Sequence, residues 1–110
     1  MENKTTATLR RRRKTLLRKL PPLEAILRGS LIERFKRCGK PGCKCAEGRG
    51  HGPKYYLSVS QPGRRPEMDY VPQDHQEKAE EYLDNYRKVK QILEELCAIS
   101  RELLRRREPF

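Results

Sequence analysis

The chain has 110 residues, of which 37% are charged and 35% hydrophobic, and its formal net charge is +11. A chain this polar is expected to bury only a modest core, and a metal, a disulfide or a partner chain often stabilises such domains. No apolar run approaches the roughly 20 residues that a bilayer-spanning helix needs. No apolar segment follows the basic N-terminus as it would in a secretory signal. We therefore expect a cytoplasmic protein that can associate with the nucleoid.

The positive charge is unevenly distributed. Residues 1–20 hold eight Lys and Arg against one Glu, and residues 21–70 hold ten against five acids. Residues 71–110 hold eight against nine acids. Lys and Arg neutralise phosphates and release counterions, so this distribution favours a polyanionic partner such as nucleic acid. The alternative is a positive charge that only keeps a small protein in solution.

The N-terminal segment has the pattern of a basic helix over residues 4–20, because one helical face can carry Leu9, Leu16, Leu17 and Leu20. Pro21 and Pro22 end this segment, since a residue before proline avoids helical geometry. A short second helix is expected over residues 22–28, with Gly29 as its C-terminal cap.

Three strands are expected in the centre of the chain. Apolar and polar residues alternate over residues 30–37, and β-favouring residues fill residues 54–61. A third strand is expected over residues 67–71, after a turn at Pro62-Gly63. Together the strands predict a small three-stranded antiparallel meander.

A long C-terminal helix is expected after the strands, because no Gly or Pro interrupts residues 75–107. Asp74 is the expected N-cap and forms a capping-box pair with Glu77. The predicted fold class is therefore α+β. Its three parts are a basic helical arm over residues 1–21, a zinc-stabilised β-meander head over residues 22–73 and the long helix over residues 74–110.

The long helix carries an apolar seam with spacings that alternate between three and four residues, as in a coiled coil. The seam comprises Tyr82, Tyr86, Val89, Leu93, Leu96 and Leu103. Ile92 and Ile99 widen this stripe. A stripe of this width must pack on the N-terminal helix, on a second copy of the chain or on another protein.

A cluster of cysteines lies in the segment Cys-Gly-Lys-Pro-Gly-Cys-Lys-Cys, and a histidine follows it. Zinc favours four tetrahedral ligands drawn from thiolates and imidazoles. Clustered cysteines in a reducing compartment favour a metal over a disulfide. The Gly-Lys-Pro-Gly insert can form a tight turn with glycine at the position that needs positive φ. The sequence therefore predicts a structural Zn²⁺ ion bound by Cys38, Cys43, Cys45 and His51.

A disulfide and an iron–sulfur centre are the alternatives to zinc. His75 and Cys97 are rival fourth ligands, but both fall on the expected long helix, where Cys97 is expected to be a small buried hydrophobe. A catalytic zinc ion needs a nearby acid or base, and Glu47, the only acid in the loop, is expected to be solvated. The sequence shows no nucleophile–base pair, carboxylate cluster or phosphate-binding loop, so we expect no enzymatic activity.

Residues 29–46, with the motif CGKPGCKCA, resemble a family of small prokaryotic proteins, and so do the segments His51-Gly52-Pro53 and Tyr70-Val71-Pro72. This family is described only as a domain of unknown function and is often met beside transposases and other mobile-element genes. The resemblance covers roughly residues 29–105 and leaves out the N-terminal arm. It implies a mobile-element setting, which favours work on DNA or on a guide RNA.

The first functional hypothesis is a nucleic-acid-binding protein, with DNA favoured over RNA, that acts as an accessory factor of a mobile element or nucleoprotein complex. Tyr55 and Tyr56 are expected to stack on unpaired bases. The alternative is a place in a small sheet core, and because the two residues are adjacent, one of them is expected to point inward. The basic contacts are expected from Arg10, Arg11, Arg12, Arg13, Lys14, Arg34, Lys36, Arg37, Lys40, Lys44, Arg49, Lys54, Arg64 and Arg65. The alternative is an assembly adaptor, in which the long helix dimerises or docks on a transposase-like partner and zinc is purely structural.

Overall fold

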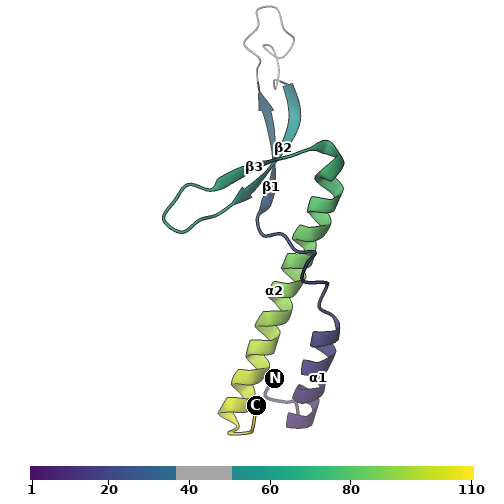
Figure 1. Cartoon of the computed structure of the whole chain (residues 1–110). Coiled ribbons are helices and arrows are strands. Elements are labelled where there is room, and N and C mark those ends of the chain that lie inside the picture. Colours follow the sequence, from purple (N-terminus) through teal and green to yellow (C-terminus); the bar gives the residue numbers. More distant parts are fainter. Residues whose placement is uncertain (37–50) are drawn as a thin grey trace, which may run out of the picture. The chain divides into compact units, whose positions relative to one another are not determined.

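The computed structural model describes residues 1–36 and 51–110 of the chain. In chain order its elements are α1 (Thr6–Arg18), β1 (Ser30–Lys36), β2 (His51–Val59), β3 (Glu67–Val71), the 3₁₀ turn η2 (Gln73–His75) and α2 (Gln76–Arg105) (Figure 1). The α+β prediction is confirmed. None of the helices among these residues is long and apolar enough to cross a membrane.

The chain divides into two compact units. One, the helical unit, comprises Met1–Ile26 and Asp84–Phe110, and the other, the sheet unit, comprises Leu27–Leu83. The helix α2 contributes its first residues to the sheet unit and the remainder to the helical unit. Each unit has its own hydrophobic core.

The helix α1 begins where the sequence predicts a helix, and a side chain caps it. Thr5 has extended backbone geometry, and its hydroxyl accepts a hydrogen bond from the Thr8 N–H at 3.1 Å. This bond satisfies one of the N–H groups that a helix leaves unpaired at its start. The helix ends at Arg18, before the two prolines.

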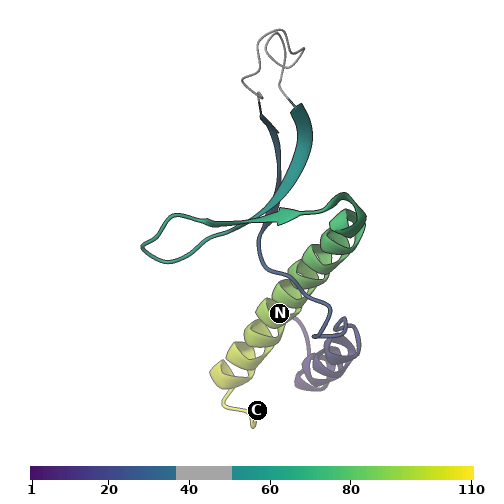
Figure 2. The ribbon, with the colours of Figure 1, turned by 45° about the horizontal axis from the view of Figure 1, so that its top comes forward.

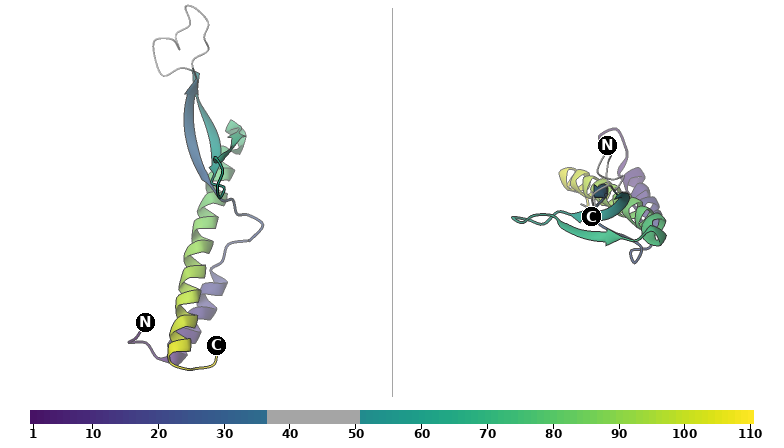
Figure 3. Two further views of the ribbon diagram at one scale, coloured as in Figure 1. Left: turned by 90° about the vertical axis from the view of Figure 1, so that its left-hand side faces the viewer. Right: turned by 90° about the horizontal axis from the view of Figure 1, so that it is seen from above.

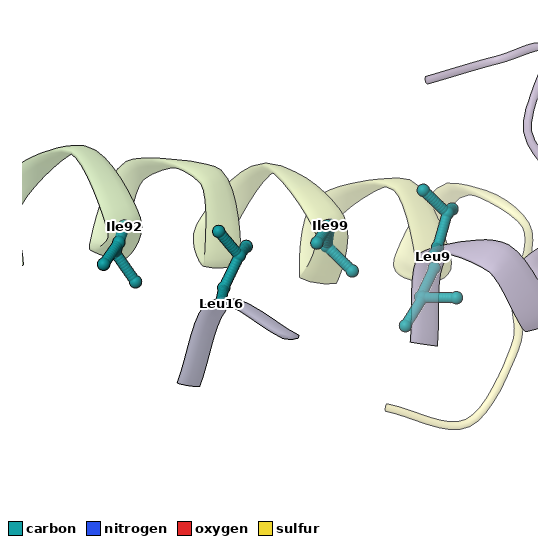
Figure 4. Close-up of a cluster of buried hydrophobic side chains, with 5 residues drawn as sticks. Leu9, Leu16, Ile92 and Ile99 are labelled. Carbon is teal, nitrogen blue, oxygen red and sulfur yellow. The ribbon is translucent and has the colours of Figure 1, made fainter. Parts of the chain in front are cut away.

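The core of the helical unit lies between α1 and α2, which run antiparallel side by side (Figure 3). Leu9 and Leu16 from α1 lie beside Ile92 and Ile99 of α2 (Figure 4). Leu103 completes the cluster, and Leu9, Ile99 and Leu103 are at most 1% exposed. The apolar stripe of α2 therefore packs on the N-terminal helix, one of the three partners that the sequence allowed.

The face that α2 turns to α1 differs from the predicted seam. It comprises Ile92, Leu96, Ile99 and Leu103, whereas Leu93 is 50% exposed. The contact residues follow the same spacings of three and four, and Leu96 and Leu103 belong to both sets. The contact face is therefore the predicted seam turned towards Ile92 and Ile99, which were expected only to widen it. On α1, Leu17 is 52% exposed although it was expected to share the face of Leu9.

The sheet unit is built on an antiparallel sheet with the strand order β1-β2-β3. The two strands β2 and β3 form a hairpin that ends in a turn (Figure 2). In this turn the Arg64 N–H donates to the Gln61 carbonyl at 3.3 Å, and Gly63 has a φ of 66°, as the Pro62-Gly63 pair predicted. One face of the sheet carries Leu57 and Val71, which pack with Leu83 of α2.

The segment between α1 and β1 corrects one prediction. No helix forms over residues 22–28; a single turn closed by the Ala25 N–H on the Pro22 carbonyl stands there instead. Hydrogen bonds to α2 replace those of a helix, because Leu27 N–H donates to the Tyr82 carbonyl and the Asn85 side chain donates to the Ala25 carbonyl.

Gly29 is therefore not a helix cap. It has a φ of +138°, and a Cβ at this position would lie 2.8 Å from the Ser58 carbonyl oxygen and 2.9 Å from Leu57. The chain needs glycine here because the backbone passes close to β2 in a conformation that other residues rarely adopt.

The start of α2 corrects a second prediction. Asp74 lies inside η2 instead of at an N-cap, and the turn is closed by the His75 N–H, which donates to the Pro72 carbonyl at 2.9 Å. A tighter turn of this type is common at the start of an α-helix. The α-helix itself begins at Gln76.

Candidate nucleic-acid interface

The basic run on α1 divides between internal contacts and solvent. Arg10 donates to the Pro109 carbonyl at 3.0 Å and lies 3.9 Å from the Glu108 carboxylate. Arg13 is half-buried, and its Nη2 atom has no hydrogen-bond partner within the described residues. These contacts belong to the face of α1 that carries Leu9 and Leu16. The five consecutive cations are therefore not equally available to a ligand.

Arg12 makes the strongest of these internal contacts. Its Nε donates to Glu95 Oε2 at 2.5 Å, and its Nη2 donates to Glu95 Oε1 at 3.1 Å. This hydrogen bonding lowers the pKa of the Glu95 carboxyl group and raises the pKa of Arg12. A guanidinium held by both oxygens of a carboxylate has two of its five N–H donors engaged and its charge paired, which disfavours a contact with phosphate. Arg12 thus serves the helical unit.

The opposite face of α1 carries Arg11, Lys14 and Arg18, which we call the cationic stripe. Their spacings of three and four residues place them above one another on one helical face. All three are exposed, and no salt bridge within the described residues involves them. α1 contains no Asp or Glu. The stripe is therefore free to bind an anion.

The sheet unit exposes further predicted cations. Arg64 and Arg65 are exposed in the hairpin between β2 and β3. Arg34 of β1 and Lys54 of β2 are paired in the sheet register and are also exposed. The Arg34 guanidinium lies 5.9 Å from the centre of the Tyr56 ring, a geometry typical of a cation–π contact.

The two tyrosines that the sequence nominated lie on opposite faces of β2. Tyr55 packs against the core beside Leu57, and its hydroxyl donates to Glu33 Oε1 at 3.0 Å, which raises the pKa of Tyr55. Tyr56 points to the other face and meets Tyr70 of β3 edge to face, with ring centres 5.7 Å apart. Tyr55 is therefore a structural residue.

Tyr70 is a candidate that sequence reasoning missed. It is directly opposite Tyr56 in the sheet register and is 56% exposed. The signal was present in the alternation of β3, in which Val71 faces the core and its neighbour must face away. Pairing the strands correctly was needed to see that the ring joins Tyr56.

The expectation of a metal-binding protein needs correction for the part of the chain that the structure describes. Residues 1–36 and 51–110 contain no group of three or more His, Cys, Asp or Glu that could hold a metal ion. Cys97 is exposed there as a free cysteine, not buried as expected. The predicted ligands Cys38, Cys43 and Cys45 lie outside the described residues, so the ligand set with His51 stays a sequence prediction.

Several predicted basic contacts also fall outside the described residues, namely Arg37, Lys40, Lys44 and Arg49. The backbone of Lys36 belongs to β1, and its side chain is outside the description. The predicted cations whose side chains are described therefore lie on α1 in the helical unit and, separately, at Arg34, Lys54 and the hairpin in the sheet unit.

Comparison with known proteins places the chain in a family. A family model with the description "Domain of unknown function (DUF6788)" matches residues 6–81. The match includes α1, which the motif resemblance left out, and it ends at residue 81, whereas the resemblance extended to about residue 105. Searches of curated proteins and of solved structures found no match. Because the matched residues make up more than half of the chain, this protein belongs to the family described as Domain of unknown function DUF6788.

Proposed function

We propose that this chain is a non-enzymatic protein that binds nucleic acid through exposed cations on α1 and on the sheet unit. The observation that carries the proposal is the cationic stripe. Arg11, Lys14 and Arg18 are exposed on one face, whereas Arg12 on the other face is held by Glu95.

The spacing of the stripe suits a phosphate backbone. Residues three and four apart on a helix lie about 5–6 Å from each other at Cβ, and long Lys and Arg side chains extend this reach. Arg11 to Arg18 spans seven residues, or about 10 Å along the helix axis. One strand of a DNA duplex carries a phosphate about every 3.4 Å along the helix axis, so a stripe of about 10 Å can meet two or three phosphates.

The sequence favours DNA over RNA and leaves open whether the DNA is single- or double-stranded; a DNA duplex is the first ligand to test. Phosphate contacts of this kind fix the position of the protein without reading bases. A place in a mobile element stays a prediction that only the motif resemblance supports.

The test removes the stripe and compares it with an equal loss of charge elsewhere. One variant carries Arg11→Gln, Lys14→Gln and Arg18→Gln, and the matched control carries Arg87→Gln, Lys88→Gln and Lys90→Gln on α2. Both lose three positive charges, and glutamine preserves helix propensity. The affinity for a labelled duplex is measured across a salt series, and its logarithm is plotted against the logarithm of the salt concentration. The slope of this plot should become shallower by roughly two to three units in the first variant and should stay unchanged in the control. Equal effects in both variants would show that the stripe makes no specific contact.

An assembly adaptor is the second candidate function, and one observation favours it. Leu93 and Leu104 of α2 are 50% and 60% exposed, and Cys97 between them is exposed as well. These three residues lie on one helical face. However, α1 already covers Ile92, Ile99 and Leu103, so the apolar area left for a partner is small. Nucleic-acid binding is therefore the function that the described residues support best.

A further inference from the structure

The sheet has a second face whose side chains differ in kind from those that face the core. Residues that are opposite each other in an antiparallel sheet point to the same side. The register aligns Ile32 with Tyr56 and Tyr56 with Tyr70 in one row across all three strands. The neighbouring pair, Arg34 with Lys54, lies on the same side. We call this side, with Ile32, Arg34, Lys54, Tyr56 and Tyr70, the open face.

Tyr70 stands out on the open face because a large aromatic ring is left 56% exposed there. The ring does not move freely, since it rests on Tyr56 with 5.7 Å between ring centres and an angle of 62° between the planes. Edge-to-face packing of this type fixes one ring and leaves its other surface available. A fixed, exposed ring can stack on a flat ligand without a further loss of side-chain freedom.

A pocket of about 510 Å³ lies beside this ring. Its lining includes Tyr70 and Lys54 from the open face, Tyr55 and Val71 from the core side of the sheet, and the amides of Gln73 and Gln76. Amide groups can donate and accept hydrogen bonds, as the edges of nucleobases do. A ligand that enters this pocket beside Tyr70 would therefore find hydrogen-bonding partners in Gln73 and Gln76.

The charge on the open face selects the kind of ligand. Arg34 and Lys54 are both exposed there, and the cation–π contact with Tyr56 holds the Arg34 guanidinium beside the aromatic row. An exposed aromatic ring next to cations on a β-sheet is the arrangement by which proteins bind single strands, with bases on the ring and phosphates on the cations. A neutral aromatic ligand would leave the two cations without a role.

We propose that the open face binds single-stranded nucleic acid, with Tyr70 as the platform for one unpaired base and with Arg34 and Lys54 on the adjoining phosphates. This inference rests on the proposed function, because it names the form of nucleic acid that the sheet unit takes. It also assigns the stacking role to Tyr70, whereas Tyr55 is held in the core by Glu33.

The experiment compares a short fluorescein-labelled oligo(dT) with a duplex of the same length by fluorescence anisotropy at one salt concentration. Tyr70→Thr removes the ring but keeps a residue that favours strands. Tyr70→Phe keeps the ring and loses the hydroxyl. Tyr86→Leu on α2 is the control for the loss of a tyrosine elsewhere. Far-UV circular dichroism verifies that each variant is folded.

We expect Tyr70→Thr to weaken oligo(dT) binding about ten-fold, in line with the stacking of one base. Duplex binding should be unchanged, and Tyr70→Phe and Tyr86→Leu should bind oligo(dT) like the wild type. If Tyr70→Thr weakens neither ligand, or both equally, the inference is overturned while duplex binding still supports the proposed function. A wild type that binds neither ligand overturns both. Binding of a proline-rich peptide that depends on Tyr70, with oligo(dT) unaffected, would assign the open face to a protein partner and overturn the inference.

Discussion

Arg12 and Glu95 form a bidentate ion pair that joins α1 to α2, although they are 83 positions apart in the chain. The two contacts fix both the distance between the helices and their register, because a guanidinium and a carboxylate meet in one plane. The pair lies beside the cluster of Leu9, Leu16 and Ile92. It therefore lies on the side of α1 that packs on α2, and the cationic stripe lies on the opposite side.

The ion pair predicts how stability depends on pH. The Arg12 hydrogen bond lowers the pKa of Glu95 from its usual value of 4.5, so the pair stabilises the fold above pH 4.5 and this contribution is lost as the pH falls through the lowered pKa. Glu95→Gln should reduce the melting temperature at pH 7 slightly, since both side chains are about one third exposed. The difference from the wild type should shrink below pH 4.5.

The neighbouring Glu94→Gln provides the control for this experiment. Glu94 is exposed and has no salt bridge within the described residues, so its replacement should leave the melting temperature unchanged. Thermal unfolding followed by circular dichroism between pH 3 and pH 7 makes the comparison. A deficit of Glu95→Gln that did not shrink at all between pH 4.5 and pH 3 would contradict the assignment.

Because α1 packs on α2 through Leu9, replacing this one leucine should strongly reduce the free energy of unfolding. Leu9 is 1% exposed, and Leu9→Ala should reduce the free energy of unfolding by about 2–5 kcal/mol through lost burial and a cavity. Leu17→Ala on the same helix, at a side chain 52% exposed, should change it by less than about 0.5 kcal/mol. Urea unfolding of both variants measures the difference. Equal effects would mean that α1 does not dock through Leu9.

The glycine before β1 predicts a contrast between two Gly→Ala replacements. At Gly29 a methyl group would collide with the Ser58 carbonyl and Leu57, and the φ of +138° adds backbone strain. Gly29→Ala should therefore reduce the free energy of unfolding by about 2–3 kcal/mol. Gly63→Ala, with a φ of +66° and no atom within 4 Å, should cost only about 1 kcal/mol. Equal costs would contradict the close approach at Gly29.

The small number of leucines left exposed on α2 predicts the oligomeric state of the protein. Since α1 covers the apolar stripe of α2, we expect the protein to be a monomer by light scattering coupled to size-exclusion chromatography. Leu93→Gln combined with Leu104→Gln, which adds no charge, should leave the mass and the duplex affinity unchanged. A doubled mass in the wild type that this variant halved would instead support the adaptor function.

Much of the fold followed from local patterns. Pro21 and Pro22 predicted the end of α1. The residue patterns around Leu57 and Val71 predicted the strands β2 and β3, and the predicted range of β3 matches the observed one. These features depend on neighbouring residues and their backbone preferences, which a sequence displays directly. The same applies to the Pro62-Gly63 turn.

Features that depend on contacts across the chain could not be predicted. The helix expected over residues 22–28 does not form, because this segment makes hydrogen bonds with Tyr82 and Asn85 instead. Local propensity does not reveal these distant partners. The division of the basic run depends on Glu95, far away in sequence. Tyr70 became a candidate only when the register placed it beside Tyr56. Tertiary contacts decide each of these positions.

The salt dependence of binding to a short labelled duplex tests the central claim most directly. If Arg11, Lys14 and Arg18 each neutralise a phosphate, the logarithm of the affinity of the wild-type protein must fall with the logarithm of salt concentration with a slope of about −3 or steeper. We predict this slope for the wild-type protein and a shallower slope for the variant in which the cationic stripe is replaced by glutamines. Absent binding, or an affinity that salt does not change, would contradict the claim.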